Sequence, residues 1–396
     1  MFKARTMNRI YDLYILILFI ILSCSQSEST NESSGAIINL NEAFLNRYPI
    51  YINDISTSYE YVRLETKEEC LTGVRLAVYS SDNYLLTVDR ERMLLFNRND
   101  GKFIRKIGHM GAGPGEFSRT YSVMPFNEVN NLIYARRNKV RYGYSFDGQL
   151  KDTLVIPELL MEIGDINDTL FAAFIPDLQG GEKYKLKIFN HNDSLIKAFP
   201  NYLSAPNTPA FFVWMPNSWY YRLNHQLYFF QLFNDTVFQI GINSIAPRFI
   251  LDMGQYSPPY ELKTSRDFQP ANYFMMRTIQ ESSRYLFCSF NFSGKNYTAI
   301  YDKMKKTTSV NDYCPDAAGS VRGFLRNEYD FIPLEFSSIN ENDELICTLN
   351  AIKIKQWFDL NPEKVNQLPE RLKALINVTE TDNPVIVIAK LNKSQQ

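Results

Sequence analysis

The sequence is poor in the residues that build metal sites and has almost no net charge. Its three histidines, His109, His191 and His225, lie far apart, and no spacing of neighbouring residues is typical of metal ligands. The 42 basic and 43 acidic residues leave a net charge of -1, so no basic excess indicates nucleic-acid binding. We therefore expect no metal, no other cofactor and no nucleic-acid partner.

Motifs of known catalytic sites are also missing. The chain has no Gly-x-Ser-x-Gly sequence, so it gives no support to serine-hydrolase chemistry. Residues Gly108 to Gly115 form a glycine-rich stretch, but it lacks the Gly-Lys-Ser/Thr ending of a phosphate-binding loop. No helix that could hold a phosphate at its N-terminus is predicted after it. We assign no catalytic residue from the sequence.

A targeting segment is predicted at the N-terminus, where Leu13 to Leu22 form an apolar run behind three basic residues. The run is too short to span a bilayer comfortably and fits the core of a signal peptide. The ending Ile-Leu-Ser-Cys24 resembles the lipobox of bacterial lipoproteins. We predict cleavage of a signal peptide of residues 1–23, acylation of Cys24, and a flexible polar tether over residues 24–35.

This prediction places the protein in the cell envelope as an outer membrane lipoprotein, attached to the membrane through Cys24. An ordinary secretory signal with an incidental cysteine is the alternative. The sequence does not distinguish the periplasmic side of the membrane from the cell surface.

The other four cysteines, Cys70, Cys288, Cys314 and Cys347, match no zinc-binding spacing. Cys288 and Cys347 lie in apolar, strand-like contexts, which predicts buried free thiols. An exported chain would permit a disulfide that involves Cys70 or Cys314, and the sequence does not decide whether one forms.

The remaining sequence favours strands and turns, because it is rich in Tyr, Phe, Ile, Thr and Asn. Four short strands between residues 74 and 107, with the tight-turn pair Asp100-Gly101, suit one blade of a β-propeller. Asp147-Gly148 repeats that pair 47 residues later, again before a strand. We predict further blades over 122–155, 168–199, 211–252 and 275–310, and the start of a sixth over 335–354.

The chain end is expected to close the ring. A helical segment is predicted from Asn361 as N-cap, with Leu368, Leu372, Leu375 and Ile376 among the residues of one face, and with a break at Pro369. The final strand, 384–391, should then join the sixth blade near an N-terminal strand, which removes an open sheet edge. The fold class is all-β: residues 36–396 form a six-bladed propeller of four-stranded antiparallel blades, with a short helical insertion near the C-terminus.

The glycine-rich stretch is predicted to be a junction between the first two blades. Glycine tolerates the backbone angles of a tight crossing, and Glu116 can bond the loop amides. The residues assigned to this junction are Gly108, Gly111, Gly113, Pro114, Gly115 and Glu116.

Six segments together resemble one family, the exported six-bladed β-propeller lipoproteins of Gram-negative gut bacteria, which are related to NHL-repeat propellers. The Gly-Ala-Gly-Pro-Gly-Glu-Phe element is the most specific of them. The resemblance implies the fold and no general enzymatic activity. The segments are 61–66, 95–104, 107–117, 233–238, 248–254 and 380–387.

The densest aromatic stretch holds Trp214, Trp219, Tyr220 and Tyr221. These rings cannot all point inward on an alternating strand, so some could contact a sugar or a partner protein. Ordinary packing between blades is the alternative. We predict a binding or scaffolding module whose ligand is a glycan, a peptide or an envelope protein. The second hypothesis is a hydrolase or lyase whose site is assembled at the mouth of the axial channel.

Overall fold

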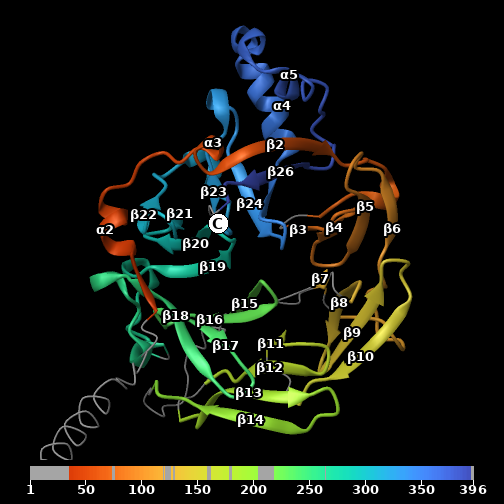
Figure 1. Cartoon of the computed structure of the whole chain (residues 1–396). Helices are drawn as coiled ribbons and strands as arrows, with labels where there is room; N and C mark the ends of the chain where they lie inside the picture. The colour runs from red at the N-terminus through yellow and green to blue at the C-terminus, as the bar shows by residue number, and fades with distance from the viewer. Residues whose placement is uncertain are drawn as a thin grey trace, which may run out of the picture. The chain divides into compact units, whose positions relative to one another are not determined.

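Six antiparallel sheets surround a central axis in the computed structural model (Figure 1), so the predicted six-bladed propeller is confirmed. The structure describes residues 35–73, 76–118, 120, 126–127, 130–157, 162–177, 181–203, 218–263 and 265–393. None of the helices within these residues is long and apolar enough to cross a membrane.

We number the blades in chain order and name the strands of each blade from the axis outward. Blade 1 contains β3 (Ala77–Ser80), β4 (Tyr84–Val88), β5 (Met93–Asn97) and β6 (Phe103–Lys106). Blade 2 contains β7 (Phe126–Asn127), β8 (Leu132–Arg137), β9 (Val140–Ser145) and β10 (Leu150–Val155). Blade 3 contains β11 (Glu162–Asp165), β12 (Leu170–Phe174), β13 (Tyr184–Asn190) and β14 (Leu195–Pro200).

Blades 4 and 5 follow the same plan. Blade 4 contains β15 (Ser218–Leu223), β16 (Gln226–Gln231), β17 (Thr236–Ile240) and β18 (Ile245–Asp252). Blade 5 contains β19 (Met275–Glu281), β20 (Tyr285–Phe292), β21 (Lys295–Asp302) and β22 (Thr307–Val310). The predicted strands 122–125 and 211–215 lie outside the described residues.

The inner strands are buried on both sides because each blade is packed between two others. Strand β5, for example, reads Met-Leu-Leu-Phe-Asn and buries its first four residues. A strand covered on both faces needs a continuous apolar run, whereas a half-exposed strand alternates. The outermost strand β6 has instead two half-buried and two exposed residues.

Blade 6 closes the ring with strands from both ends of the chain. It contains the short β23 (Phe324–Leu325), β24 (Leu334–Ile339), β25 (Glu344–Leu349), β26 (Val385–Leu391) and, outermost, β2 (Ser56–Arg63). Strand β26 pairs with β25 on one side and with β2 on the other. The predicted closure by the final strand beside an N-terminal strand is therefore confirmed.

The segment that leads to β2 wraps around three blades, and we call residues 36–63 the N-terminal strap (Figure 1). It contains β1 (Ala36–Asn39), α2 (Leu40–Leu45) and α3 (Ile52–Ile55) before β2. Strand β1 pairs in parallel with β18 of blade 4. Tyr48 then forms a β-bridge to Asn311, just after blade 5, and Tyr51 forms one to Arg326, which follows β23 in blade 6.

A helical insertion separates β25 from β26, but it begins earlier than predicted. It contains α4 (Ala351–Leu360), the 3-10 helix η7 (Pro362–Gln367) and α5 (Glu370–Lys373). The start of the sixth blade was predicted to run to residue 354, which is wrong beyond Leu349, because the Asn350 side chain accepts a hydrogen bond from the Lys353 amide and starts α4. Asn361 begins η7 without a side-chain cap, and Ile376, expected on the buried face, is 47% exposed.

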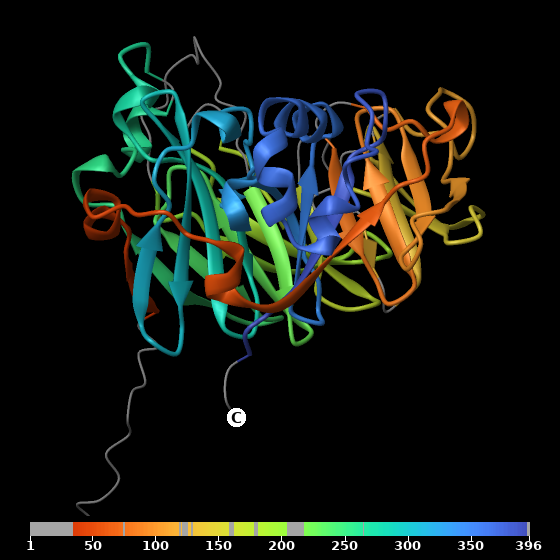
Figure 2. The ribbon, with the colours of Figure 1, turned by 90° about the horizontal axis from the view of Figure 1, so that it is seen from above.

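The two faces of the ring differ, as the view in Figure 2 shows. One face, which we call the turn face, carries the short hairpin turns such as 81–83 and 98–102. The other, the connection face, carries the segments between blades and the helical insertion (Figure 2). Strand β1 runs parallel to β18 and so starts from the turn face, and Leu391 at the end of β26 donates its amide to Asp343 in a turn of that face.

Connections between blades also carry short 3-10 helices on the connection face. They are η1 (Glu68–Cys70), η2 (Gly254–Tyr256), η3 (Tyr260–Leu262), η4 (Pro270–Asn272) and η5 (Pro315–Ala317), whereas η6 (Glu328–Asp330) lies between β23 and β24 within blade 6.

Candidate functional site

The predicted ligand-contact residues lie on β15, the innermost strand of blade 4, and most of their surface is buried. Tyr220 is 5% exposed and packs towards blade 3, where its ring lies against Gly164. Tyr221 is 7% exposed and points towards blade 5, where its hydroxyl donates to Glu281 Oε2 at 2.9 Å. Burial raises the pKa of both hydroxyls well above the ordinary value.

Trp219, the third described aromatic residue of this stretch, adds no exposed patch. Trp219 is half-buried against the core between blades 4 and 5, with its ring 5.6 Å from that of Phe230. Trp214 lies outside the described residues. Blades cover both sides of β15, so four of its six residues are buried and Trp219 and Arg222 are half-buried, and the geometry favours packing over ligand contact.

The glycine-rich stretch runs between β6 and β7, from blade 1 to blade 2. Its amides are occupied by the chain itself: Gly111 N donates to Phe117 O at 2.9 Å, and Gly113 N donates to Glu116 Oε2 at 2.7 Å. The Glu116 carboxylate thus stands where a bound anion would need to be. Gly115 has a φ of 73°, which favours glycine.

Side chains of blade 2 hold this stretch in place. Arg137 donates to Gly113 O at 2.6 Å, and Tyr144 donates to Gly115 O at 2.6 Å. Gly108 lies against the rings of Phe117 and Tyr144, with a φ of 58°. All of these contacts are structural, and none leaves a free donor directed at a ligand.

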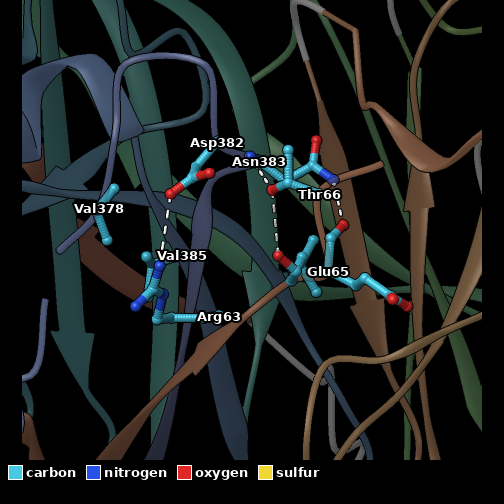
Figure 3. A pocket seen from close by; sticks show the side chains of 8 residues that line it. Arg63, Glu65, Thr66, Val378, Asp382, Asn383 and Val385 are labelled. Carbon is cyan, nitrogen blue, oxygen red and sulfur yellow. Dashed lines mark hydrogen bonds and ion pairs between the residues drawn. The ribbon is translucent and has the colours of Figure 1, made fainter. Parts of the chain in front are cut away.

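A cavity of about 350 Å³ lies on the connection face where the ring closes (Figure 3). We call it the closure cavity. One wall is the end of β2 and the residues after it, and the other is the loop that precedes β26 together with the start of β26. Its lining residues are Arg63, Leu64, Glu65, Thr66, Val378, Asp382, Asn383 and Val385.

Asn383 fixes the back of the closure cavity. It is 4% exposed, and its Nδ2 donates to Glu65 O at 2.8 Å and to Cys70 O at 2.9 Å. Its Oδ1 accepts from the Thr72 amide at 2.8 Å, and its own amide donates to Thr66 Oγ1 at 2.9 Å. These bonds tie the two walls together, so the cavity is pre-formed.

Arg63 and Asp382 are the charged groups at the mouth of the closure cavity (Figure 3). Their closest atoms, Arg63 NH2 and Asp382 Oδ2, are 3.5 Å apart, and the Arg63 side chain is 46% exposed. Such a long, solvated contact contributes little to stability and leaves most guanidinium donors available. The Glu65 carboxylate is less available to a ligand, because it already accepts hydrogen bonds from Lys67 and from the Phe103 amide. These hydrogen bonds also lower the pKa of the carboxyl.

A polar row on β2 extends from the closure cavity along blade 6. Tyr59, Tyr61 and Arg63 share one face of the strand, because side chains alternate along it. Tyr61 donates to Asn327 Oδ1 at 3.2 Å, and Arg371 donates to the Tyr59 hydroxyl at 3.2 Å. Burial, with a hydrogen bond to Glu328, raises the pKa of Tyr59 to about 12, so this phenol is neutral at physiological pH.

One donor in this row has no protein partner. Asn327 is 1% exposed, and its Nδ2 makes no hydrogen bond in the part of the chain that the structure describes. Its Oδ1 is used by Tyr61 and by the Glu328 amide. A buried amide donor left over in this way usually needs a water or a ligand atom.

Metal binding has no matching geometry here. Within the described residues, no three side chains of His, Cys, Asp or Glu are grouped closely enough to hold an ion. Cys70, Cys288, Cys314 and Cys347 are all buried free thiols, so the question of a Cys70 or Cys314 disulfide is answered, and the prediction for Cys288 and Cys347 is confirmed. Burial raises the pKa of the Cys288 thiol far above its usual value.

The closure cavity and the polar row could not be predicted from the sequence. Residues 61–66 and 380–387 were each recognised as family-like segments, yet Arg63 and Asp382 lie 319 positions apart. The period-two spacing of Tyr59, Tyr61 and Arg63 was the one local signal, since it places two phenols and a guanidinium on one strand face.

Comparisons with known proteins find one matching family model and solved structures that are similar to this chain. A family model described as "Domain of unknown function (DUF4934)" matches residues 35–390. A crystal structure described as a "Putative exported protein" from Bacteroides fragilis has a TM-score of 0.64 and 17% identity, and the match covers 90% of this chain and 100% of that chain. The WD40 domain of Neurospora crassa Pan2 has a TM-score of 0.36 and 10% identity, with 85% and 97% covered. No curated protein sequence matches this chain.

Proposed function

We propose that this chain, which belongs to the DUF4934 family, is a lipid-anchored propeller of the bacterial cell envelope that binds a glycan end in its closure cavity. The observation that carries the proposal is the closure cavity itself, a pre-formed polar pocket on the face opposite to the one where the described chain starts and ends. The likeness in fold to an exported protein is compatible with a binding or scaffolding module.

The anchor would be the acylated Cys24 at the start of the tether. Strand β1 starts from the turn face, so the tether would join the propeller on that face. The relationship to NHL-repeat propellers is part of this proposal and rests on the six family-like segments.

The chemistry of the closure cavity suits a hydroxylated ligand. Arg63 offers donors, the Asp382 carboxylate accepts, and Val378 and Val385 line the cavity with only 2% and 1% of their surface exposed. A sugar presents donors, acceptors and an apolar ring face together, and a volume of about 350 Å³ is at the lower end of small-ligand sites. A peptide or an envelope protein would need a longer groove or a broader apolar surface.

Binding is tested with glycan arrays and titration calorimetry on the wild type and on Arg63→Ala. Charge-assisted hydrogen bonds are worth about 1.5 to 3 kcal/mol, so the variant should bind roughly tenfold or more weakly. Arg90→Ala, which removes another exposed arginine of the connection face, is the matched control and should bind as the wild type does. Equal affinity of Arg63→Ala and wild type would exclude the closure cavity as the site.

The anchor is tested separately with Cys24→Ala in the producing bacterium. The variant should leave the membrane fraction and incorporate no radioactive palmitate. Retention of label in Cys24→Ala would contradict lipidation at this residue. A pull-down that recovered a specific envelope protein, with no glycan bound, would favour the scaffolding alternative.

A further inference from the structure

The ionisable groups of the closure cavity balance one another. Three of its lining residues are ionisable: Arg63, Glu65 and Asp382. Glu65 is compensated from outside the lining, because Lys67 Nζ lies 2.5 Å from its Oε1 and the Phe103 amide donates to its Oε2 at 2.9 Å. One positive and one negative group, Arg63 and Asp382, are therefore left to meet a ligand. A neutral ligand keeps this balance, whereas a charged ligand would face a like charge at close range.

The Asp382 carboxylate is held in place by its own loop. Its Oδ2 accepts from the Thr379 amide at 3.0 Å, and the Asp382 amide donates to the Thr379 carbonyl oxygen at 3.1 Å. Asn383, the next residue, is tied to the opposite wall, because its amide donates to Thr66 Oγ1 at 2.9 Å. Asp382 therefore cannot turn away when a ligand enters. Its Oδ1 accepts no hydrogen bond from the residues that the structure describes, so this oxygen is available to a ligand donor.

Arg63 is held more loosely than Asp382 (Figure 3). The contact between Arg63 NH2 and Asp382 Oδ2 measures 3.5 Å, whereas a charge-assisted hydrogen bond between such groups is usually about 2.7 to 2.9 Å long. Within the described part of the chain, the guanidinium makes no other hydrogen bond. A ligand oxygen can therefore enter between the two side chains and replace this long contact with shorter ones.

Hydroxyl groups match this arrangement, because each of them is both a donor and an acceptor. Two adjacent hydroxyls of a pyranose ring lie about one hydrogen-bond length apart, so one can accept from Arg63 while its neighbour donates to Asp382 Oδ1. Val378 and Val385 are almost fully buried, so the ring face of a sugar meets little apolar surface in the cavity. Recognition then depends on the polar edge of the sugar.

We propose that the closure cavity selects neutral glycan ends that carry two adjacent free hydroxyls, and that it rejects acidic sugars. Arg63 and Asp382 set this specificity: the guanidinium donates to one hydroxyl oxygen, and the carboxylate accepts from the other hydroxyl. A uronic acid would bring a further carboxylate into a cavity where Arg63, the one cationic side chain of the lining, is already shared with Asp382. This inference rests on the proposed function, because it concerns the ligand of the same cavity.

The experiment compares matched sugars by titration calorimetry on the full-length protein. The probes are the methyl glycosides of glucose, galactose and mannose, and those of the three corresponding uronic acids, in which a carboxylate replaces the hydroxymethyl group. At least one neutral glycoside should bind, and it should bind at least about tenfold more tightly than its uronic acid. Methylation of either hydroxyl of the recognised pair should weaken its binding roughly tenfold.

Asp382→Asn separates the charge of this residue from its shape. The amide oxygen of asparagine can still accept from Thr379, so the loop is kept while the carboxylate is lost. The variant should bind the neutral glycoside about fivefold more weakly and the uronic acid more tightly than the wild type does. Glu380→Gln removes an exposed carboxylate of the same loop that does not line the cavity, so this matched control should change neither affinity.

The outcomes separate this specificity from glycan binding as such. A wild type that binds a uronic acid more tightly than the matching neutral glycoside would overturn the inference, as would unchanged affinities in Asp382→Asn. If Arg63→Ala still weakened binding in either case, the cavity would remain the glycan site and only its selectivity would be wrong. Failure of every neutral glycoside to bind would also overturn the inference, and the absence of any glycan binding on the arrays would refute the proposed function itself.

Discussion

Blades 4 to 6 are crossed by the N-terminal strap, whereas blades 1 to 3 turn outer strands to solvent. Strap residues Ile38, Leu40 and Phe44 belong to the core between blades 4 and 5. Three more, at positions 50, 52 and 55, belong to the core between blades 5 and 6. On the other half, the outer strands β10 and β14 expose apolar side chains: Leu150, Val155, Leu195 and Ile196 are 44 to 54% exposed.

The difference shows two ways to hold neighbouring blades together. In the strapped half, a segment from elsewhere adds apolar burial to the interfaces, which is the dominant favourable term in folding. In the open half, a buried ion pair joins blades 2 and 3: Arg141 NH1 lies 2.8 and 2.9 Å from the two carboxylate oxygens of Asp165. The halves meet at two junctions, Gly101 beside the end of β2, and Lys185 between blades 3 and 4.

The largest effect is expected for Phe44→Ala in the strap. Phe44 is 5% exposed, and its ring lies edge-on to those of Phe274, Phe292 and Tyr297 at 4.9 to 5.2 Å. Removing a buried phenylalanine leaves a cavity as well as losing transfer free energy, so the free energy of unfolding should fall by about 4 kcal/mol. Urea denaturation measures the change.

Leu45→Ala is the matched control for the strap. Leu45 is the next residue of α2 but is 65% exposed, so its truncation should change stability by less than about 0.5 kcal/mol. Equal losses for the two variants would mean that the strap acts through its helix rather than through burial, and the comparison of the two halves would fail.

The buried ion pair of the open half gives the second prediction. Asp165→Asn should cost about 3 kcal/mol, because it leaves the Arg141 guanidinium, 5% exposed, with only the Asp152 carboxylate at 4.0 Å. Glu281→Gln is the counterpart in the strapped half, where Arg248 and Lys303 share that carboxylate. Arg248 is 36% exposed and can be hydrated, so this variant should cost less than Asp165→Asn. The reverse order in chemical denaturation would contradict the argument.

The junction of blade 6 with blade 1 gives the third prediction. Gly101 has a φ of 68°, and a Cβ there would lie 2.0 Å from the carbonyl oxygen of Arg63. Gly101→Ala should therefore cost about 2 to 3 kcal/mol, from the strained backbone and the clash together. Gly294→Ala has a similar φ of 74° but open space around the new Cβ, so about 1 kcal/mol is expected. Thermal melts of the pair isolate the clash, and equal melting temperatures would exclude it.

Local sequence was enough to predict the blades and the ring closure. Strands such as β5 and β20 are short apolar runs between tight turns, and both their type and approximate bounds follow from that pattern. The course of the strap over blades 4 to 6 was not predicted, because β18, the partner of its first strand, begins more than 200 positions later and no local signal links them. Helix α4 was missed for a similar reason, since only Asn350 separates it from an equally apolar strand.

The candidate site could not be predicted in the same way. The aromatic residues of β15 stood out because alternation suggested that some must be exposed, but a propeller covers both sides of its inner strands. Arg63, Asp382 and Asn383 are unremarkable in sequence and acquire a role only when the ring closes. In the sequence Lys185 does not differ from the other lysines. Only in the folded protein do a β-bulge of β13 and the surrounding blades bury its side chain.

The smallest effect, and the one of opposite sign, is expected for Lys185→Met at the other junction. The folded-state pKa of about 8 lies below the unfolded value of about 10.4, so below pH 8 the folded protein bears the full cost of a buried ammonium. Methionine removes that cost and should stabilise the protein by about 1 to 2 kcal/mol at pH 7. Between pH 8 and about 10.4 the unfolded wild type binds more protons than the folded one, so wild-type stability rises with pH and the advantage of methionine shrinks. Urea denaturation of both proteins from pH 7 to 10 follows this convergence, with the exposed Lys183→Met as the control that should show no difference at any pH. A constant gap between wild type and Lys185→Met would mean that Lys185 stays charged in the folded state, and the junction would then need a counter-ion from outside the described chain.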